Sequence, residues 1–252
     1  TDVPTGAFWA LAFDEAVLVT LCRLREALLA DCESPSRKAL RAIILGALHG
    51  PRAKHEQGHF SNQSPRTYSP KPAYAVKFWR QHSLLPPKVD VLETIHLRAQ
   101  RFYGHESSTA RGTMASGDSR LESSFAGIKD KPAWIVTSPP YYGMRTYIPD
   151  QWLRNWFLGG PATVHYCSEG QMSHLSKQDF ADGLRRVWLN CAAIAKPGCR
   201  LIIRFGAIND RRLDARALLK ASLADTPWKI LTCHNAGTAS QGRRQADAFV
   251  PT

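Results

Sequence analysis

Paired cysteines, acidic side chains and uncharged apolar runs are all scarce in this chain of 252 residues. Its 6 cysteines are scattered, with no CxxC pair and no histidine at finger spacing, which argues against a zinc site and favours free thiols in a reducing cytoplasm. We expect no signal peptide. The most apolar stretch, residues 7–29, is interrupted by charges, so a membrane-spanning helix is excluded. The interrupting residues include Asp14, Glu15, Arg23 and Arg25.

The shortage of acidic residues leaves a strongly basic chain. There are 33 Lys and Arg against 21 Asp and Glu, a formal net charge of +12. A basic surface favours a polyanionic partner, because neutralising phosphates releases their counterions. The composition therefore favours nucleic acid as a partner, although many basic proteins bind none.

Helical patterns fill the first part of the chain. Leucines at helical spacing predict one helix from about residue 7 to 30, and Ser34 with Pro35 starts another. Further helices are predicted within 69–82, 86–104 and 213–224. A later helix starts at a capping-box-like pair, Ser176 and Asp179.

Strand patterns occupy the later part. AWIVTSPPY (133–141) is continuously apolar, as is typical of a strand buried on both faces of a parallel sheet. KPGCRLIIRFG (196–206) reads as a Pro-Gly turn feeding a buried strand. Strands at 228–235 and 246–250 would form a final antiparallel pair. Alternating strands and helices predict a layered α/β sheet.

The stretch TSPPYYG (137–143) directly follows the first predicted strand. Parallel sheets place active sites beyond the carboxyl ends of their strands. A double proline fixes the backbone and lacks N–H donors, so the carbonyls of Ser138 and Pro139 can be aimed in advance at the two protons of an exocyclic amine. Tyr141 can stack on the base that carries this amine. The alternative is an ordinary turn.

These residues resemble a known family. TSPPY resembles motif IV, (S/T/D/N)-P-P-(Y/F/W), of the S-adenosylmethionine-dependent DNA amino-methyltransferases. The serine form is most associated with N4-cytosine enzymes, and the Asp or Asn form is commoner in N6-adenine enzymes. GDSR (117–120) resembles the acidic turn that contacts the cofactor, and KPGCRLIIRFG is similar to the P-G-G-x-L strand of that fold.

The resemblance implies a Rossmann-like methyltransferase fold, a mixed sheet with a terminal antiparallel hairpin. We expect a single domain over 1–252, with a helical and basic-loop insertion at 36–104 and an aromatic-rich insertion at 143–175 over the active site. Asp2-Val3-Pro4 resembles the acidic ribose-binding turn; its alternative is a helix cap. The implied catalytic residues are Ser138, Pro139, Pro140 and Tyr141, and the implied cofactor-binding residues are Asp2, Asp118, Thr137 and Ser138.

The family's motif I, the F-x-G-x-G cofactor loop, is missing from this sequence. We therefore expect an N-terminally incomplete cofactor fold. An upstream segment or a partner chain supplies this loop, or the protein has lost cofactor binding.

Cations mixed with aromatics are candidates for contact with DNA. Tyr147 or Trp152 would support a base extruded from the duplex, and 241–245 is a further phosphate contact or a hairpin turn. The alternatives are a solvated loop and an aromatic satellite core. No metal site is predicted, since His49, His55 and His59 fit no common ligand spacing. The candidate phosphate contacts are Lys54, Arg66, Lys71, Arg145 and Arg154.

The sequence thus predicts methyl transfer from S-adenosylmethionine to N4 of cytosine in double-stranded DNA. The setting would be a prokaryotic restriction–modification system, in the cytoplasm and associated with the nucleoid. The alternatives are methylation of N6 of adenine or of an RNA amine, and a DNA-binding subunit whose cofactor loop comes from a partner chain.

Overall fold

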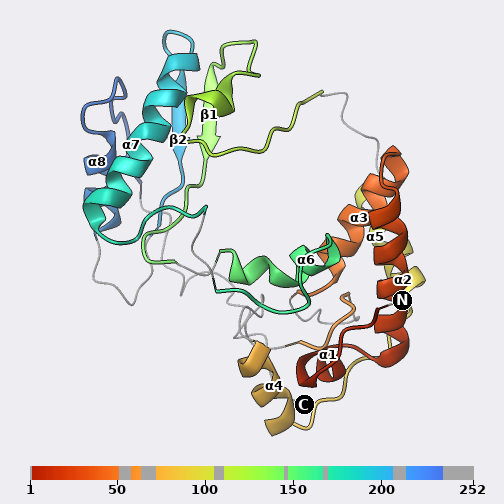
Figure 1. Cartoon of the computed structure of the whole chain (residues 1–252). Helices are drawn as coiled ribbons and strands as arrows, with labels where there is room; N and C mark the ends of the chain where they lie inside the picture. Colours follow the sequence, from red (N-terminus) through yellow and green to blue (C-terminus); the bar gives the residue numbers. More distant parts are fainter. Residues whose placement is uncertain are drawn as a thin grey trace. The chain divides into compact units, whose positions relative to one another are not determined.

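The computed structural model describes residues 2–50, 58–63, 72–104, 111–144, 147–166, 170–206 and 214–234 (Figure 1). The chain divides into two compact units, each assembled from separate segments of the sequence. The helical unit comprises residues 1–109, 148–167 and 236–252, and the sheet unit comprises residues 110–147 and 168–235.

The helical unit contains the whole of the predicted insertion 36–104, and the predicted insertion 143–175 contributes to both units. One methyltransferase domain over the whole chain stays a prediction.

Within the described part of the chain, every helix is too short or too polar to cross a membrane. The helices of this unit are α1 (Ala7–Ala12), α2 (Glu15–Ala30), α3 (Pro35–Ala47), α4 (Pro72–Gln81), α5 (Val91–Tyr103) and α6 (Trp152–Phe157), with a 3₁₀ turn η2 (Pro149–Gln151).

The helix predicted over residues 7–30 is two helices, so that prediction is wrong in its continuity. Phe13 has an extended backbone, with φ −130° and ψ 139°. Asp14 then caps α2, because its side chain accepts a hydrogen bond from the backbone N–H of Ala16. An aspartate that binds a nearby backbone N–H favours a helix start over a helix interior, which explains the break.

An aromatic cluster forms the core of the helical unit. The Trp9 ring lies 4.6 Å from Trp156 and 5.6 Å from Trp152 between ring centroids, and Phe8 lies 5.7 Å from Trp79. Trp152 is only 6% exposed. The prediction that Trp152 supports an extruded base is therefore wrong, because its indole is packed among other rings; the alternative, an aromatic core, is confirmed for this residue.

The sheet unit is built on two parallel strands, β1 (Trp134–Thr137) and β2 (Arg200–Ile203), the only strands among the described residues. Trp134 pairs with Arg200, and Thr137 pairs with Ile203. A Rossmann-like mixed sheet stays a prediction. The predicted strand at 228–235 has no strand in its described residues, and its predicted partner 246–250 lies outside the described residues. The other elements are η1 (Glu122–Phe125), α7 (Lys177–Ile194) and α8 (Ala215–Leu223).

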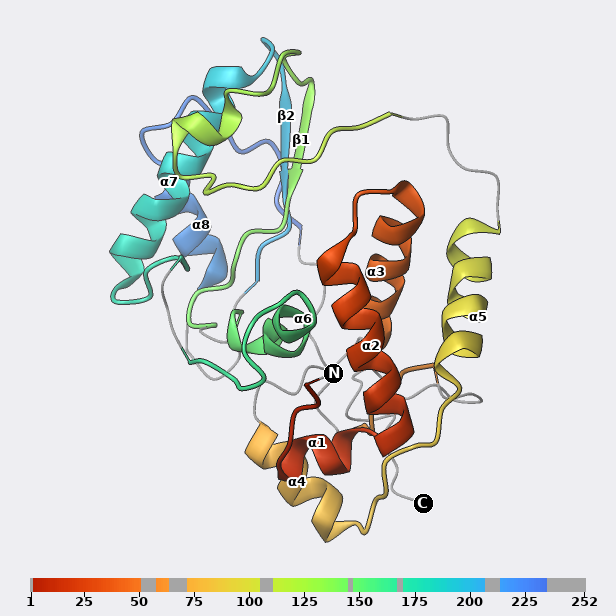
Figure 2. The ribbon, with the colours of Figure 1, turned by 45° about the vertical axis from the view of Figure 1, so that its right-hand side comes forward.

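Both helices of this unit lie on the same side of the two strands (Figures 1 and 2). Leu201 and Ile203 of β2 pack against their apolar side chains. At the centre, Trp188 of α7 is fully buried, and its indole N–H donates to Ser222 Oγ of α8 at 3.0 Å. A single core therefore joins β2, α7 and α8.

The opposite face of the sheet is open. Trp134 is 63% exposed, Val136 74% and Ile202 48%. Trp134 and Ile202 also border a cavity of about 520 Å³, whose wall includes Leu201 and Ile203 of β2, residues of α8 and residues 228–234. The expectation that the first strand is buried on both faces is not met, because nothing in the described part of the sheet unit packs over these side chains.

Truncating Leu184 of α7 to alanine should lower the free energy of unfolding by about 2–5 kcal/mol, as for other buried leucines. Leu184 is 1% exposed, in the core of the sheet unit. Leu189 of the same helix is 42% exposed, so Leu189→Ala is the matched control and should change stability by no more than about 0.5 kcal/mol. Urea unfolding followed by tryptophan fluorescence measures both. Equal losses would contradict this account of the core.

Candidate active site

The stretch after β1 begins at the edge where both strands end. The backbone N–H of Arg204 donates to Thr137 O at 2.9 Å, so the ladder continues to the last residue of β1. Ser138 is exposed, whereas Pro139 is buried. The buried proline anchors the turn in the protein, and the exposed serine is accessible at the sheet edge.

The ring of Tyr141 lies against the end of β2. A Cβ atom placed on Gly206 would lie 3.2, 3.3 and 3.5 Å from Tyr141 Cζ, Cε1 and Cε2. These nearly equal distances mean that Gly206 approaches the face of the ring. An approach within the ring plane, along the line from Cγ to Cζ, would leave the two Cε atoms clearly farther away than Cζ. Gly206 thus lies over the Cζ end of one face of Tyr141, which leaves the other face for a stacking group.

Two side chains from outside the TSPPYYG stretch accept hydrogen bonds from its backbone. The N–H of Tyr141 donates to Tyr147 Oη at 2.9 Å. The N–H of Gly143 donates to His174 Nδ1 at 3.0 Å. The hydroxyl oxygen of Tyr147 accepts this N–H, and support of an extruded base by Tyr147 stays a prediction. His174 was not identified from the sequence, because no spacing signal links it to a glycine 31 residues away.

Asp118 lies in a tight turn and is paired with Arg120. The Arg120 side chain donates to both carboxylate oxygens, with Nη2 at 2.6 Å from Oδ2, and the Arg120 backbone N–H donates to Oδ1 at 2.9 Å. Side-chain and then backbone hydrogen bonds from Arg120 hold the pKa of the Asp118 carboxyl below its ordinary value. Ser119 O accepts from Asn190 of α7 at 3.0 Å, which fastens the turn to the sheet unit.

Asp2, the predicted ribose ligand, belongs to the helical unit. Its alternative role as a helix cap is wrong, because Gly6 is the N-cap of α1 and no side chain caps that helix. Asp2 is exposed, and its negative charge is one of several influences on the Cys22 thiol, whose pKa is raised mainly by burial. Thr137, Ser138 and Asp118 all belong to the sheet unit.

Of the five predicted phosphate contacts, Arg154 alone lies among the described residues. Arg154, on α6, uses Nε to donate to Leu45 O at 3.1 Å and Nη1 to donate to Gln151 at 2.6 Å, so its guanidinium joins parts of the helical unit. Contact of Arg154 with DNA stays a prediction. The remaining candidates, Lys54, Arg66, Lys71 and Arg145, lie outside the described residues, as does 241–245.

His49 and His59, two of the three histidines that fit no common ligand spacing, are buried. His49 is 8% exposed and lies 2.9 Å from Ser61 Oγ, and His59 is 9% exposed. Burial, followed by the nearby charge of Arg98, lowers the pKa of His59 to about 4, so its ring is neutral at physiological pH. The described residues contain no group of three or more His, Cys, Asp or Glu able to hold a metal ion.

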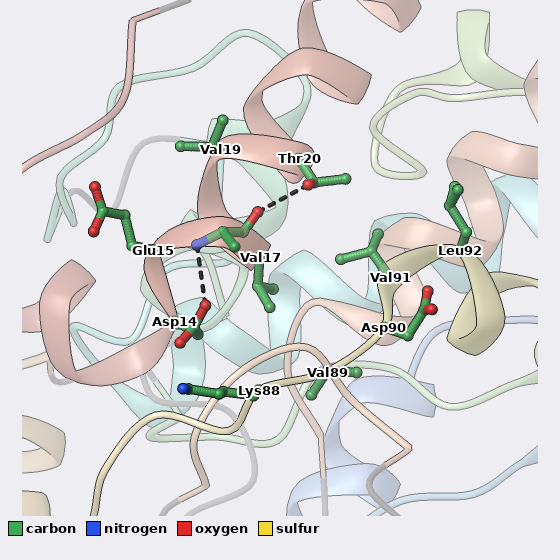
Figure 3. Close-up of a pocket in the computed structure, with 11 residues that line it drawn as sticks. Asp14, Glu15, Val17, Val19, Thr20, Lys88, Val89, Asp90, Val91 and Leu92 are labelled. Carbon is green, nitrogen blue, oxygen red and sulfur yellow. Dashed lines mark hydrogen bonds between the residues drawn. The ribbon is translucent and has the colours of Figure 1, made fainter.

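A separate cavity of about 910 Å³ lies in the helical unit, where α2 and α5 begin (Figure 3). Asp14 caps α2 and Asp90 caps α5, each by accepting a backbone N–H. Carboxylates thus occupy both helix starts, and Lys88 is the one cation among the described residues that line the cavity. The lining therefore does not favour a phosphate.

Comparison with known proteins gives no match: no family model, no curated protein and no solved structure is significantly similar to this chain.

Replacing Arg120 with methionine should raise the pKa of Asp118 towards the ordinary value of about 3.9, because the side-chain hydrogen bonds are the main cause of its depression. A carboxyl whose pKa is lower in the folded protein than in the unfolded chain stabilises the fold at pH values above its unfolded pKa. This stabilisation is lost as the pH falls through the folded-state pKa. Arg120→Met should therefore be less stable than the wild type at pH 7, with the difference vanishing in acid.

NMR titration of the Asp118 carboxyl carbon measures its pKa. Urea unfolding at pH 7 and in acid measures the difference in stability. Arg111→Met is the control, since it removes an exposed arginine that is not part of the Asp118–Arg120 pair. An unshifted Asp118 in Arg120→Met, or an equal shift in the control, would contradict the assignment.

Proposed function

We propose that this chain is the base-binding part of a DNA amino-methyltransferase, acting on N4 of cytosine. The observation that carries the proposal is the turn after β1, with exposed Ser138 beside buried Pro139 and one face of Tyr141 covered by Gly206. Acceptors on a fixed backbone beside a one-sided aromatic platform suit a flat base with an exocyclic amine. The net charge of +12 further supports a nucleic-acid partner.

In this proposal the residues of the turn act on the amine before and during transfer. The Ser138 hydroxyl and the Pro139 carbonyl accept hydrogen bonds from the two amine protons, which leaves more electron density on N4. Tyr141 stacks on the base through its uncovered face. S-adenosylmethionine supplies an electrophilic methyl group. N4 would form the new bond to the methyl carbon as the carbon–sulfur bond of the sulfonium breaks, S-adenosylhomocysteine would leave with that electron pair, and N4 would then lose one proton to solvent.

The residues present fit the amine side of this reaction and only part of the cofactor side. Thr137 and Ser138 lie at the strand end, but the acceptor atoms of Asp118 are engaged by Arg120, and Asp2 belongs to the other unit. The glycine-rich cofactor loop of the family is also missing from the sequence. A further segment or a partner chain would therefore supply the remaining cofactor contacts.

The second candidate is a nucleic-acid-binding subunit without activity of its own, completed by a partner chain. The open apolar face of the sheet favours it, because Trp134 and Val136 are 63% and 74% exposed and parallel sheets are normally covered on both faces. Calorimetry with S-adenosylmethionine discriminates. Binding by the chain alone favours an autonomous enzyme, and binding only after a partner is added favours the two-chain form.

Removing the serine hydroxyl or the tyrosine ring should abolish transfer while leaving the fold and non-specific DNA affinity intact. We expect Ser138→Ala to lower the rate by at least about 10²-fold, the loss typical of one preorganised polar contact. Tyr141→Ala should lose transfer because it removes the stacking platform. Mass spectrometry of digested DNA measures 4-methylcytosine, in a system where the wild-type chain is active.

Ser123→Ala removes an exposed serine hydroxyl from η1 of the same unit and is the matched control; it should retain full activity. Full activity in Ser138→Ala or in Tyr141→Ala would contradict the catalytic role proposed for the turn. The appearance of 6-methyladenine in place of 4-methylcytosine would assign the chain to the adenine alternative.

A further inference from the structure

We propose that Tyr147 and His174 are positioning residues that hold the TSPPYYG turn by accepting two of its backbone N–H groups. The inference concerns the shape of the turn itself, and its catalytic consequence rests on the proposed function. Neither residue belongs to the motif, and each acts through the backbone of the motif.

The double proline makes these contacts important. Pro139 and Pro140 have no N–H, so the first backbone donor after Ser138 is that of Tyr141. Among the backbone N–H groups of residues 141–143, those of Tyr141 and Gly143 donate to side chains. The turn is therefore held at two points by single side-chain atoms, and each can be removed by one substitution.

The acceptor from His174 is held in place by packing. His174 is 9% exposed, and its ring stacks on Phe180 of α7, with ring centroids 5.3 Å apart and ring planes at 28°. Tyr142 contacts the same Phe180 ring edge to face at 5.4 Å. Phe180 itself is fully buried. His174 thus connects the core side of α7 to the backbone of the turn, at a residue where φ is +87° and glycine is favoured.

The acceptor from Tyr147 bears on the stacking residue directly. Its hydroxyl oxygen accepts the N–H of Tyr141, whose ring faces Gly206 at the end of β2. The Tyr141 backbone is thus held by Tyr147, and its ring is contacted by Gly206. Loss of the Tyr147 acceptor should therefore loosen the platform and lower kcat more than it raises the KM for DNA.

The experiment is hydrogen exchange of the full chain, read by mass spectrometry or by nitrogen-15 NMR over residues 141–144. Tyr147→Phe removes only the hydroxyl acceptor. His174→Phe keeps a ring for stacking on Phe180 and removes the acceptor, whereas His174→Asn loses the ring but keeps an acceptor near the position of Nδ1. Tyr103→Phe is the control, because it deletes the same phenolic hydroxyl from a tyrosine on α5 that is 60% exposed.

Tyr147→Phe and His174→Phe should each speed exchange in 141–144 by about fivefold to tenfold, the factor expected for one lost hydrogen bond. His174→Asn should exchange more slowly than His174→Phe, and the control should match the wild type. Unchanged exchange in both Tyr147→Phe and His174→Phe, or equal exchange in the two His174 variants, overturns the proposal. Urea midpoints for each variant separate local loosening from unfolding.

Exchange needs neither DNA nor cofactor, so this test is independent of the proposed function. Faster exchange in a chain that never methylates DNA would support the positioning role and reject the methyltransferase. Methylation by the wild type with exchange and kcat unaltered in both acceptor-removing variants would do the reverse.

Discussion

Parallel pairing of β1 with β2 brings the ends of the two strands to one edge of the sheet, and the contacts of the turn depend on this register. Thr137 lies opposite Ile203, so the residues that follow each strand emerge together. This places the Tyr141 ring against Gly206, which no local feature of either stretch requires. A slip of one residue would turn Leu201 and Ile203 away from the core, so the same apolar contacts that stabilise the sheet unit also set the geometry of the turn.

Local signals predicted what is local. The Ser176 start of α7 is confirmed, since Ser176 Oγ accepts the Asp179 N–H at 3.0 Å, and the Pro-Gly turn before β2 is confirmed by Gly198 at φ +77°. Both depend on residues a few positions apart, whose chemistry is visible in the sequence.

The sequence could not predict what depends on distant residues. Trp152 looked like an exposed aromatic in a basic segment, but it is buried against Phe8 and Trp9, which lie far away along the chain. His174 carried no signal at all, since its role comes from Phe180 beneath it and Gly143 beside it. Periodicity and motif spacing report neither kind of contact, because each requires knowing which surfaces meet.

The pairing of Asp118 with Arg120 does not by itself remove Asp118 from a cofactor role. Their side chains are 36% and 28% exposed, and partly exposed ion pairs contribute only about 0–1 kcal/mol after solvent screening. A ligand that offers two N–H or O–H donors to the carboxylate could displace Arg120 at small cost. The ion pair therefore orders the turn without a ligand, and a cofactor role for Asp118 stays a prediction.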